Sequence, residues 1–539
     1  MDREQKFDFG NLPCCGIEFI KLIIKKMRYR RKVRQEVQAE LIAHFEDALR
    51  DCHTDEEKQQ TAEKIIADFG NPNILARLLR RGKKRCRPVW AKALVRAGQV
   101  IGIFILFLAL RIGYLASGTA TMSIDYAEWL NEKVRAGRDP NLNAMPLYEE
   151  AAGLLIEMPE TINTIHTKWP GDVNELGREE LAKWIAANEK AIEVIRKASQ
   201  YPYYWRSYKR DAPDSPLSGT MGGLLDSLQI HKQFAYLLSR KSSNEAYSGD
   251  TEEALEDCLV MLKFARHHQA RLLLVEQLVG VAIEALALGS AYEVLDRSAI
   301  SKKTLRKFSI ELNEILVPRN QVFDYELEKA FLYEKVQKSF TDDGSGNGRM
   351  LLKGIPFAGS DAKSILWNFL TMNLPDRLEI IEKIDEYFTL IDEQLQESPW
   401  QIRQTDTEAN DKKQIRSGIA LVDLMAPALG RINELSQRLL GDERGLVTVA
   451  AVLLYDKEKG KLPESLDDLV ASGYMEQIPK DPYGGKPLIY KKTADGFTLY
   501  GVGLNFVDDG GKMGTKNGRP FKWAESGDTV HWPVARRTD

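Results

Sequence analysis

Hydrophobic residues recur at helical spacing over most of this chain. The first series lies between residues 28 and 80, where apolar side chains fall three to four positions apart. Thr54 and Glu57 have the spacing of a capping box, which predicts the start of a second helix, and residues 70–72 (Gly-Asn-Pro) predict its end. The pattern therefore predicts a small helical domain over residues 1–88.

The same spacing dominates the middle of the chain, where strand signals are almost absent. It predicts a helical bundle over residues 118–440, with its clearest helices at residues 181–198, 223–238, 251–265, 322–340 and 378–395. Residues 271–288 are apolar around most of the helix circumference, which predicts central burial in this bundle, with a second membrane crossing as the alternative. Glu276 and Glu284 favour burial in protein, because an acid at mid-membrane costs about 3 kcal/mol. Residues 341–364 predict a flexible excursion from the bundle.

From residue 441 the pattern changes from helical spacing to alternation. A helix at residues 446–457 is followed by two alternating runs at 487–491 and 497–501, with Asp-Gly between them. Asp-Gly between alternating runs is typical of a tight hairpin turn. We predict a small α+β module with an antiparallel sheet over residues 441–539, and a mainly α fold for the chain as a whole.

The most apolar stretch of the chain, residues 97–110, contains no charge. Its 14 residues span about 21 Å as a helix, less than the roughly 30 Å of a bilayer core. Apolar character resumes after Arg111 and continues to Ala116, and Arg111 lies near enough to the end to reach the headgroups. We predict one transmembrane helix over residues 89–117. A buried hairpin in a soluble protein is the alternative.

Charge changes sign across this stretch. The net charge of −3 combines +8 over residues 1–96 (22 Lys/Arg, 14 Asp/Glu) with −11 over the remainder (53 Lys/Arg, 64 Asp/Glu). Residues 77–96 contain nine Lys/Arg, whereas residues 117–137 contain only Lys133 and Arg135. The positive-inside rule predicts a cytoplasmic N-terminus and an extracytoplasmic C-terminal bulk. Because the basic run lacks interleaved aromatic residues, it favours anionic lipid and not nucleic acid as its partner.

Composition is that of a folded protein, since 43% of residues are hydrophobic and 28% are charged. Four of the five cysteines precede the apolar stretch, and only Cys258 follows it. The exported part therefore cannot form an intramolecular disulfide, and its stability must come from its core.

The predicted cytoplasmic helices carry a recognisable set of residues, namely Glu36, Glu40, Leu41, His44, Phe45, Asp47, Ala62, Phe69, Gly70, Asn71, Pro72, Leu75 and Ala76. With this set the domain resembles the HAAS-type signalling domain, found at the cytoplasmic face of bacterial membrane proteins. The resemblance implies an interaction or signalling role and a place in the bacterial inner (cytoplasmic) membrane. Glu40 and His44 share a helix face, which we interpret as a solvated face and not as a metal site, because no second ligand pair lies nearby.

The C-terminal module also carries an ordered set of residues, namely Tyr455, Gly460, Pro463, Leu466, Leu469, Ile478, Pro479, Asp481, Pro482, Gly484, Tyr490, Leu499, Tyr500 and Gly503, followed by residues 508–511 and 528. It resembles the C-terminal domain of the major pseudopilin of type II secretion. Because the module lies far along the chain from the apolar stretch, we expect a borrowed fold and not a filament subunit. The family often binds calcium in its last loop, so the resemblance implies Asp508, Asp509 and Asp528 as ligands. A solvated acidic turn is the alternative, because basic residues in the same loop would oppose a cation.

No catalytic motif emerges, and no cofactor other than calcium is implied. His267 and His268 are adjacent and diverge by about 100° on a helix, so they cannot chelate one metal as an i, i+4 pair would. We predict a non-enzymatic single-pass membrane protein with a signalling or scaffolding role, in contact with the lipid bilayer and with protein partners on both sides of it. The alternatives are an envelope hydrolase whose site is assembled from distant residues of the helical domain, and an accessory component of a type II secretion-like assembly.

Overall fold

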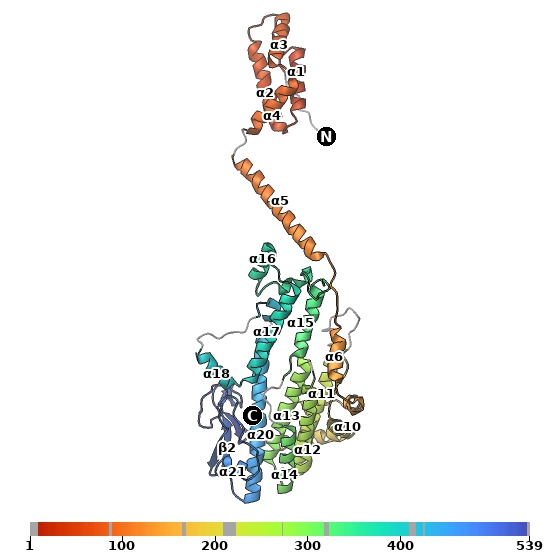
Figure 1. The fold of residues 1–539 in the computed structure, drawn as a ribbon, viewed down its shortest axis with the longest axis vertical. Coiled ribbons are helices and arrows are strands. Elements are labelled where there is room, and N and C mark those ends of the chain that lie inside the picture. Colours follow the sequence, from red (N-terminus) through yellow and green to blue (C-terminus); the bar gives the residue numbers. More distant parts are fainter. Residues whose placement is uncertain are drawn as a thin grey trace. The chain divides into compact units, whose positions relative to one another are not determined.

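The computed structural model describes residues 9–85, 89–163, 169–208, 222–271, 273–316, 323–408, 417–423 and 426–535. The chain forms two compact units, an N-terminal unit (Met1–Tyr114) and a C-terminal unit (Leu115–Asp539). The protein is mainly helical with a small antiparallel sheet near its C-terminus, which confirms the predicted fold class at this level (Figure 1).

The N-terminal unit is built from the helices α1 (Cys14–Met27), α2 (Arg31–Ala48), α3 (Asp55–Phe69), α4 (Pro72–Arg85) and α5 (Val89–Ala116). Helix α3 begins at the predicted capping box, in which the Thr54 hydroxyl accepts the Glu57 N–H and the Glu57 carboxylate accepts the Thr54 N–H. Helix α1 was not predicted. It contributes Ile20 and Ile23 to a core that also contains Phe45 of α2.

Helix α5 and the later helix α13 (Leu274–Arg297) are long and apolar enough to cross a membrane, and no other helix among the described residues passes this test. None of the most apolar 18-residue window of α5 is buried, whereas 67% of the corresponding window of α13 is buried within the C-terminal unit. The central burial predicted for residues 271–288 is therefore confirmed.

The C-terminal unit is a helical bundle with irregular connections. Its first helices are α6 (Tyr126–Arg135), α7 (Met145–Leu154), α8 (Glu160–Asn163), α9 (Glu175–Ala187), α10 (Glu189–Ser199), α11 (Gly222–Ser248) and α12 (Thr251–Gln269). After α13 come α14 (Lys302–Ile315), α15 (Glu326–Ser339), α16 (Ala362–Thr371), α17 (Arg377–Gln396), α18 (Pro399–Glu408), α19 (Ala420–Asp423), α20 (Ala426–Lys459) and α21 (Asp467–Ala471). Short 3-10 helices lie at η1 (Pro140–Leu142), η2 (Pro170–Asp172) and η4 (Leu352–Phe357).

Helices α12 and α13 approach closely at Gly280. A Cβ at this position would lie 2.9 Å from both the carbonyl oxygen of Ala265 and the backbone nitrogen of Gln269. Only glycine permits this approach, so residue 280 sets the packing distance of the two central helices.

The C-terminal sheet has the strand order β1 (Ile489–Thr493), β2 (Gly496–Gly501), β5 (Thr529–Trp532), and both pairings are antiparallel. Strands β1 and β2 form the predicted hairpin, with Thr493 opposite Gly496. A separate two-stranded ribbon joins β3 (Thr515–Lys516) to β4 (Arg519–Pro520).

The expected boundary between residues 440 and 441 lies inside helix α20, which runs unbroken from Ala426 to Lys459. This helix packs on α13 and α14 and also supports β2 and β5. Gly445 makes the contact with the sheet possible, because a Cβ there would lie 2.1 Å from Nδ1 of His531 on β5. The bundle and the sheet module therefore share one hydrophobic core and one compact unit, and this differs from the two separate domains expected from the sequence.

The expected excursion at residues 341–364 contains defined elements. Phe340 forms an antiparallel bridge with Met350, and the Thr341 N–H donates to the Arg349 carbonyl at 3.0 Å. Helix η4 follows, and α16 begins at Ala362. Glycines at 344 and 346 close this hairpin with φ of +89°, a conformation in which a side chain would be strained.

Candidate functional site

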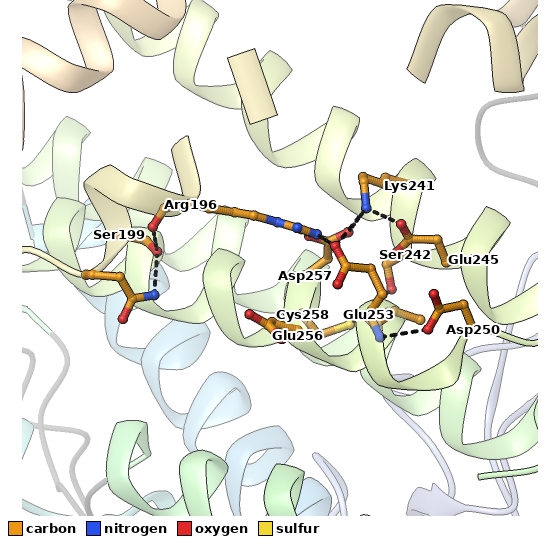
Figure 2. A network of polar contacts seen from close by, with 12 residues as sticks. Arg196, Ser199, Lys241, Ser242, Glu245, Asp250, Glu253, Glu256, Asp257 and Cys258 are labelled. Carbon is orange, nitrogen blue, oxygen red and sulfur yellow. Dashed lines mark hydrogen bonds and ion pairs between the residues drawn. The ribbon is translucent and has the colours of Figure 1, made fainter. Parts of the chain in front are cut away.

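Five charged side chains from three helices form a network inside the C-terminal unit (Figure 2). Arg196 of α10 donates from Nε to Asp257 Oδ1 of α12 at 3.0 Å, and Lys241 of α11 lies 3.3 Å from Asp257 Oδ2. Glu253 contacts both cations, and Glu245 contacts Lys241. Asp257 is fully buried, so its charge is compensated by protein groups and not by water.

Burial is the largest cause of the pKa shifts in this network. It raises the pKa of Glu245 to about 8, and the nearby charge of Asp257 acts in the same direction. Burial lowers the pKa of Lys241, but Asp257 and Glu245 outweigh this effect, so the net pKa of Lys241 is raised. Arg196 and Lys241 face the carboxyl groups of Glu245, Glu253 and Asp257, and this network joins α10, α11 and α12.

A polar cleft of about 420 Å³ lies beside the network and is lined by Arg196, Lys197, Gln200, Glu256, Leu259, Val260, Lys263 and Glu311. Two of its charges form a pair, since Lys263 lies 3.8 Å from Glu311. The cleft is suited to a small polar molecule of either sign, and its geometry does not select between them.

A second buried group surrounds the Arg271–Glu276 ion pair. Arg271 Nε lies 2.9 Å from Glu276 Oε1, and both side chains are completely buried. The Tyr208 hydroxyl donates to Glu276 Oε2 at 2.8 Å, and the Arg271 guanidinium lies over the rings of Tyr208 and Tyr204. The aromatic residues of this segment are thus partly used as walls for a buried cation, and Tyr204 and Tyr208 are themselves buried.

Three histidines lie in the same interior. His267 contacts the Tyr148 hydroxyl through Nδ1 at 2.8 Å and the Tyr201 carbonyl through Nε2 at 2.9 Å. His268 points instead to His231, with ring centroids 4.8 Å apart. The two adjacent histidines therefore diverge, as their spacing predicted.

These histidines are neutral at physiological pH. Burial lowers the pKa of His231 to about 3 and that of His267 to about 4, and it lowers the pKa of His268 well below its ordinary value. Both ring nitrogens of His268 and Nδ1 of His231 have no hydrogen-bond partner among the described residues. The described part of the chain contains no group of three His, Cys, Asp or Glu side chains placed to hold a metal ion.

The thiol of Cys258 lies in α12, directly after Asp257. It is fully buried, 3.3 Å from the Ser242 hydroxyl, and burial raises its pKa to about 12. A thiol that stays protonated is not an activated nucleophile.

A groove of about 1620 Å³ lies between the bundle and the sheet module. Its walls come from α14, α18, α20 and the segment from Val470 to Gly485, and they include Ile310, Trp400, Arg444, Tyr474 and Met475. Arg444 Nη1 donates to the Lys480 carbonyl at 2.9 Å, which ties one wall to the other. The mixture of apolar, aromatic and charged side chains is typical of a surface that binds protein or peptide.

The three aspartates implied as calcium ligands lie in one loop. Asp528 accepts the N–H of Asp509 at 3.1 Å and of Gly511 at 2.6 Å, so a backbone donor occupies each of its oxygens. Asp508 accepts from the Tyr500 hydroxyl at 3.1 Å. Asp509 accepts from Asn505 at 2.7 Å. In this conformation the carboxylates organise the loop and are not directed at one point, so the residues do not fit a calcium ion as placed. Calcium binding stays a prediction.

Asp481 plays a structural part that was not predicted. Its carboxylate is buried and accepts the N–H groups of Tyr483 at 3.0 Å and Val502 at 2.8 Å. Gly501 leaves the space for it, since a Cβ there would lie 2.8 Å from the Asp481 carboxyl carbon. In the sequence, the Asp-Pro-Tyr-Gly segment at residues 481–484 was the signal that could have indicated this structural role of Asp481.

In the N-terminal unit, Glu40 and His44 have separate partners. Glu40 forms an ion pair with Lys83 at 2.6 Å, and the His44 ring lies 5.3 Å from the ring of Phe69. Neither side chain is directed at a shared ligand.

Comparison of the chain with protein-family models, with curated proteins and with solved structures gives no match.

Proposed function

We propose that this protein is a single-pass membrane protein of the bacterial inner membrane with a non-enzymatic signalling or scaffolding role. The observation that carries the proposal is helix α5, in which Ala93–Ala116 are long and apolar enough to cross a membrane and the most apolar window has no buried residue. A helix with this much exposed apolar surface is stable in lipid and unfavourable in water.

The charges beside α5 support the orientation. Nine Lys/Arg lie in residues 77–96, before the uncharged stretch of α5 at residues 97–110, against two in residues 117–137. On this basis the N-terminal unit lies in the cytoplasm and the C-terminal unit lies outside it. The resemblance of residues 1–88 to HAAS-type domains supports a signalling role for the cytoplasmic unit.

The groove between the bundle and the sheet module supports a binding role for the exported unit. Trp400, Tyr474 and Met475 are residue types favoured at the centre of protein interfaces, and Arg444 is too. In this proposal the groove takes a protein or peptide partner in the envelope, and the crossing helix connects that event to the cytoplasm.

Reporter fusions test the topology. An exported reporter fused after residue 130 should be active, and the same reporter fused after residue 60 should be inactive. Activity at 60 or its absence at 130 would contradict the orientation. If the full-length protein stayed in the supernatant after ultracentrifugation of a detergent-free lysate, the membrane role itself would be wrong.

A binding assay tests the groove separately. Trp400→Ala with Met475→Ala should abolish crosslinking between the full-length protein and its envelope partners, while Leu176→Ala, an exposed apolar residue outside the groove lining, should leave it unchanged. Equal crosslinking by both variants would contradict a partner site in the groove.

A further inference from the structure

The hairpin of residues 340–350 is tied to the start of the C-terminal unit. Arg349 Nη2 donates to the Ser117 carbonyl at 2.6 Å and to the Ser117 hydroxyl at 3.0 Å. A Cβ built on Gly118 would lie 3.1 Å from Arg349 Nη2 and 3.2 Å from Thr341 Cγ2 of the hairpin. Ser117 directly follows Ala116, the last residue of α5. The hairpin is therefore held one residue from the end of the apolar helix.

Helix α16 is fixed to this hairpin through η4. The Phe340–Met350 bridge leads into η4, and Asn368 of α16 donates to the Ala358 carbonyl at the end of η4 at 2.6 Å. Helix η4 has six residues, which span about 12 Å at the rise of a 3-10 helix. Figure 1 shows α16 at the end of the bundle where the chain enters the C-terminal unit.

The two faces of α16 differ in their surroundings. Ile365 packs against the main core, and Asn368 makes the hydrogen bond to η4. The opposite face carries Leu366 and Trp367, which are 58% and 67% exposed, and Met372 at the end of the helix is 62% exposed. Among the described residues of the C-terminal unit, these are three of the four most exposed large apolar side chains.

The composition of this surface suits the boundary between headgroups and acyl chains. Tryptophan is favoured at that depth, and leucine and methionine provide apolar area. Lys353 and Lys363 are exposed on η4 and at the start of α16, where they could contact anionic lipid headgroups. A surface helix of ten residues with an apolar outer face and flanking lysines has the features of an interfacial helix.

We propose that α16 lies in the outer interface of the membrane that α5 crosses, with Leu366, Trp367 and Met372 inserted among the lipids. The proposal rests on the membrane crossing proposed above. The occupant of this apolar face is lipid because the Ser117–Arg349 contact keeps the helix near the point where the chain leaves the bilayer. A second contact with the membrane would restrict the tilt of the C-terminal unit and present its groove at a defined height.

Spin-label accessibility in the full-length protein tests this proposal. The protein, with its five cysteines replaced by alanine, is reconstituted into nanodiscs of phosphatidylcholine and phosphatidylglycerol. Labels are placed one at a time at Trp367→Cys, at Leu366→Cys as a second site on the same face, at Ile105→Cys in α5 and at Asp467→Cys in α21. Asp467 is exposed, and α21 lies at the opposite end of the C-terminal unit from α16 (Figure 1). Collision rates with oxygen, which partitions into lipid, and with a water-soluble nickel chelate are then compared.

We expect the ratio of the oxygen to the nickel collision rate to be severalfold higher at 366 and 367 than at 467. The ratio at 366 and 367 should stay below that at 105. If 105 is lipid-exposed and 366 and 367 match 467, the interfacial helix is wrong and the crossing stands. If 105 also matches 467, the crossing itself is wrong. If 366 and 367 are shielded from oxygen and nickel alike, protein covers α16, and the lipid assignment is overturned.

Discussion

Helices α5 and α13 are alike in length and apolar character, yet their surroundings differ completely. Both contain 24 residues that satisfy a membrane-spanning criterion. Helix α5 has no buried residue in its apolar window, whereas α13 lies in the middle of the bundle with Glu276, Gln277 and Glu284 completely buried.

The polar groups of α13 explain the difference. Glu276 pairs with Arg271, and Glu284 accepts from Gln269 at 2.5 Å. Gln277 exchanges two hydrogen bonds of 2.8 Å with the backbone of Asp324. A bilayer offers no such partners, so these three side chains identify a helix that is solvated by protein. Apolar content alone does not separate the two cases, and the partners of the few polar groups do.

The largest expected effect comes from placing charge in α5. Ile103→Asp with Leu106→Asp should remove the protein from the membrane fraction, since each acid near the helix centre costs about 3 kcal/mol. Sedimentation and alkaline extraction of membranes measure this. Ile103→Ala with Leu106→Ala is the matched control and should stay in the pellet. Retention of the double aspartate variant would mean that lipid does not surround α5.

In α13 the stability depends on a buried charge that is already present, the carboxylate of Glu276. Glu276→Ala should destabilise the C-terminal unit by about 3–5 kcal/mol, because it leaves Arg271 buried without its partner. Urea unfolding of the full-length protein in detergent measures the loss. Removing both charges, in Arg271→Met with Glu276→Leu, should recover much of it. If the double variant were no more stable than Glu276→Ala, the unpaired charge of Arg271 would not be the cause of the loss.

Truncating one isoleucine in each helix gives the most direct comparison. Ile283→Ala in α13 should cost about 2–5 kcal/mol, because Ile283 is buried and its removal leaves a cavity. Ile103→Ala in α5 should leave the unfolding free energy of both units nearly unchanged, because Ile103 is 68% exposed and packs against no core. Similar losses at the two positions would place α5 in a protein core, as the alternative of a soluble hairpin requires.

Acid should weaken the interior around α13 and leave α5 unaffected. The pKa of His231 is lowered to about 3 and that of His267 to about 4 in the fold, so the unfolded chain binds these protons more readily. Their contribution, up to about 3 kcal/mol each, is complete above pH 6.5 and is lost as the pH falls through 6.5 toward 4. His268→Phe should make the fall in melting temperature with acid shallower, because it removes one buried proton acceptor. An unchanged slope would contradict burial of a neutral His268.

The smallest effect concerns helix packing. Gly280→Ala should cost about 1–3 kcal/mol, because its Cβ would overlap the backbone of α12. Gly289→Ala in the same helix meets nothing within 4 Å and should be neutral or stabilising by about 0.5–1 kcal/mol. Thermal unfolding of the two variants checks the contrast, and equal effects would mean that the close crossing of α12 and α13 is not formed.

The features predicted correctly are local ones. The capping box at Thr54, the hairpin turn before Gly496 and the apolar helix before Ala116 each depend on residues close together in the chain. The buried network was not predictable, since Arg196 and Asp257 are 61 positions apart and look like ordinary surface charges in sequence. The boundary expected near residue 440 failed for the same reason, because the continuity of α20 depends on two different surfaces packing along one helix.

By itself the sequence determined most of the helices, where the sheet hairpin turns, and which two stretches are apolar enough to be removed from water, and the acids of the second stretch already favoured its burial in protein. Hydrophobic spacing, capping residues and turn residues act over a few positions, so they can be recognised directly in the sequence. Only the tertiary structure decided which residues surround the polar groups of α13, which acids are paired with cations inside the bundle, and that α16 turns its apolar face outward. These outcomes depend on the free energy of burying one side chain against others distant in sequence. No local sequence pattern gives this free energy.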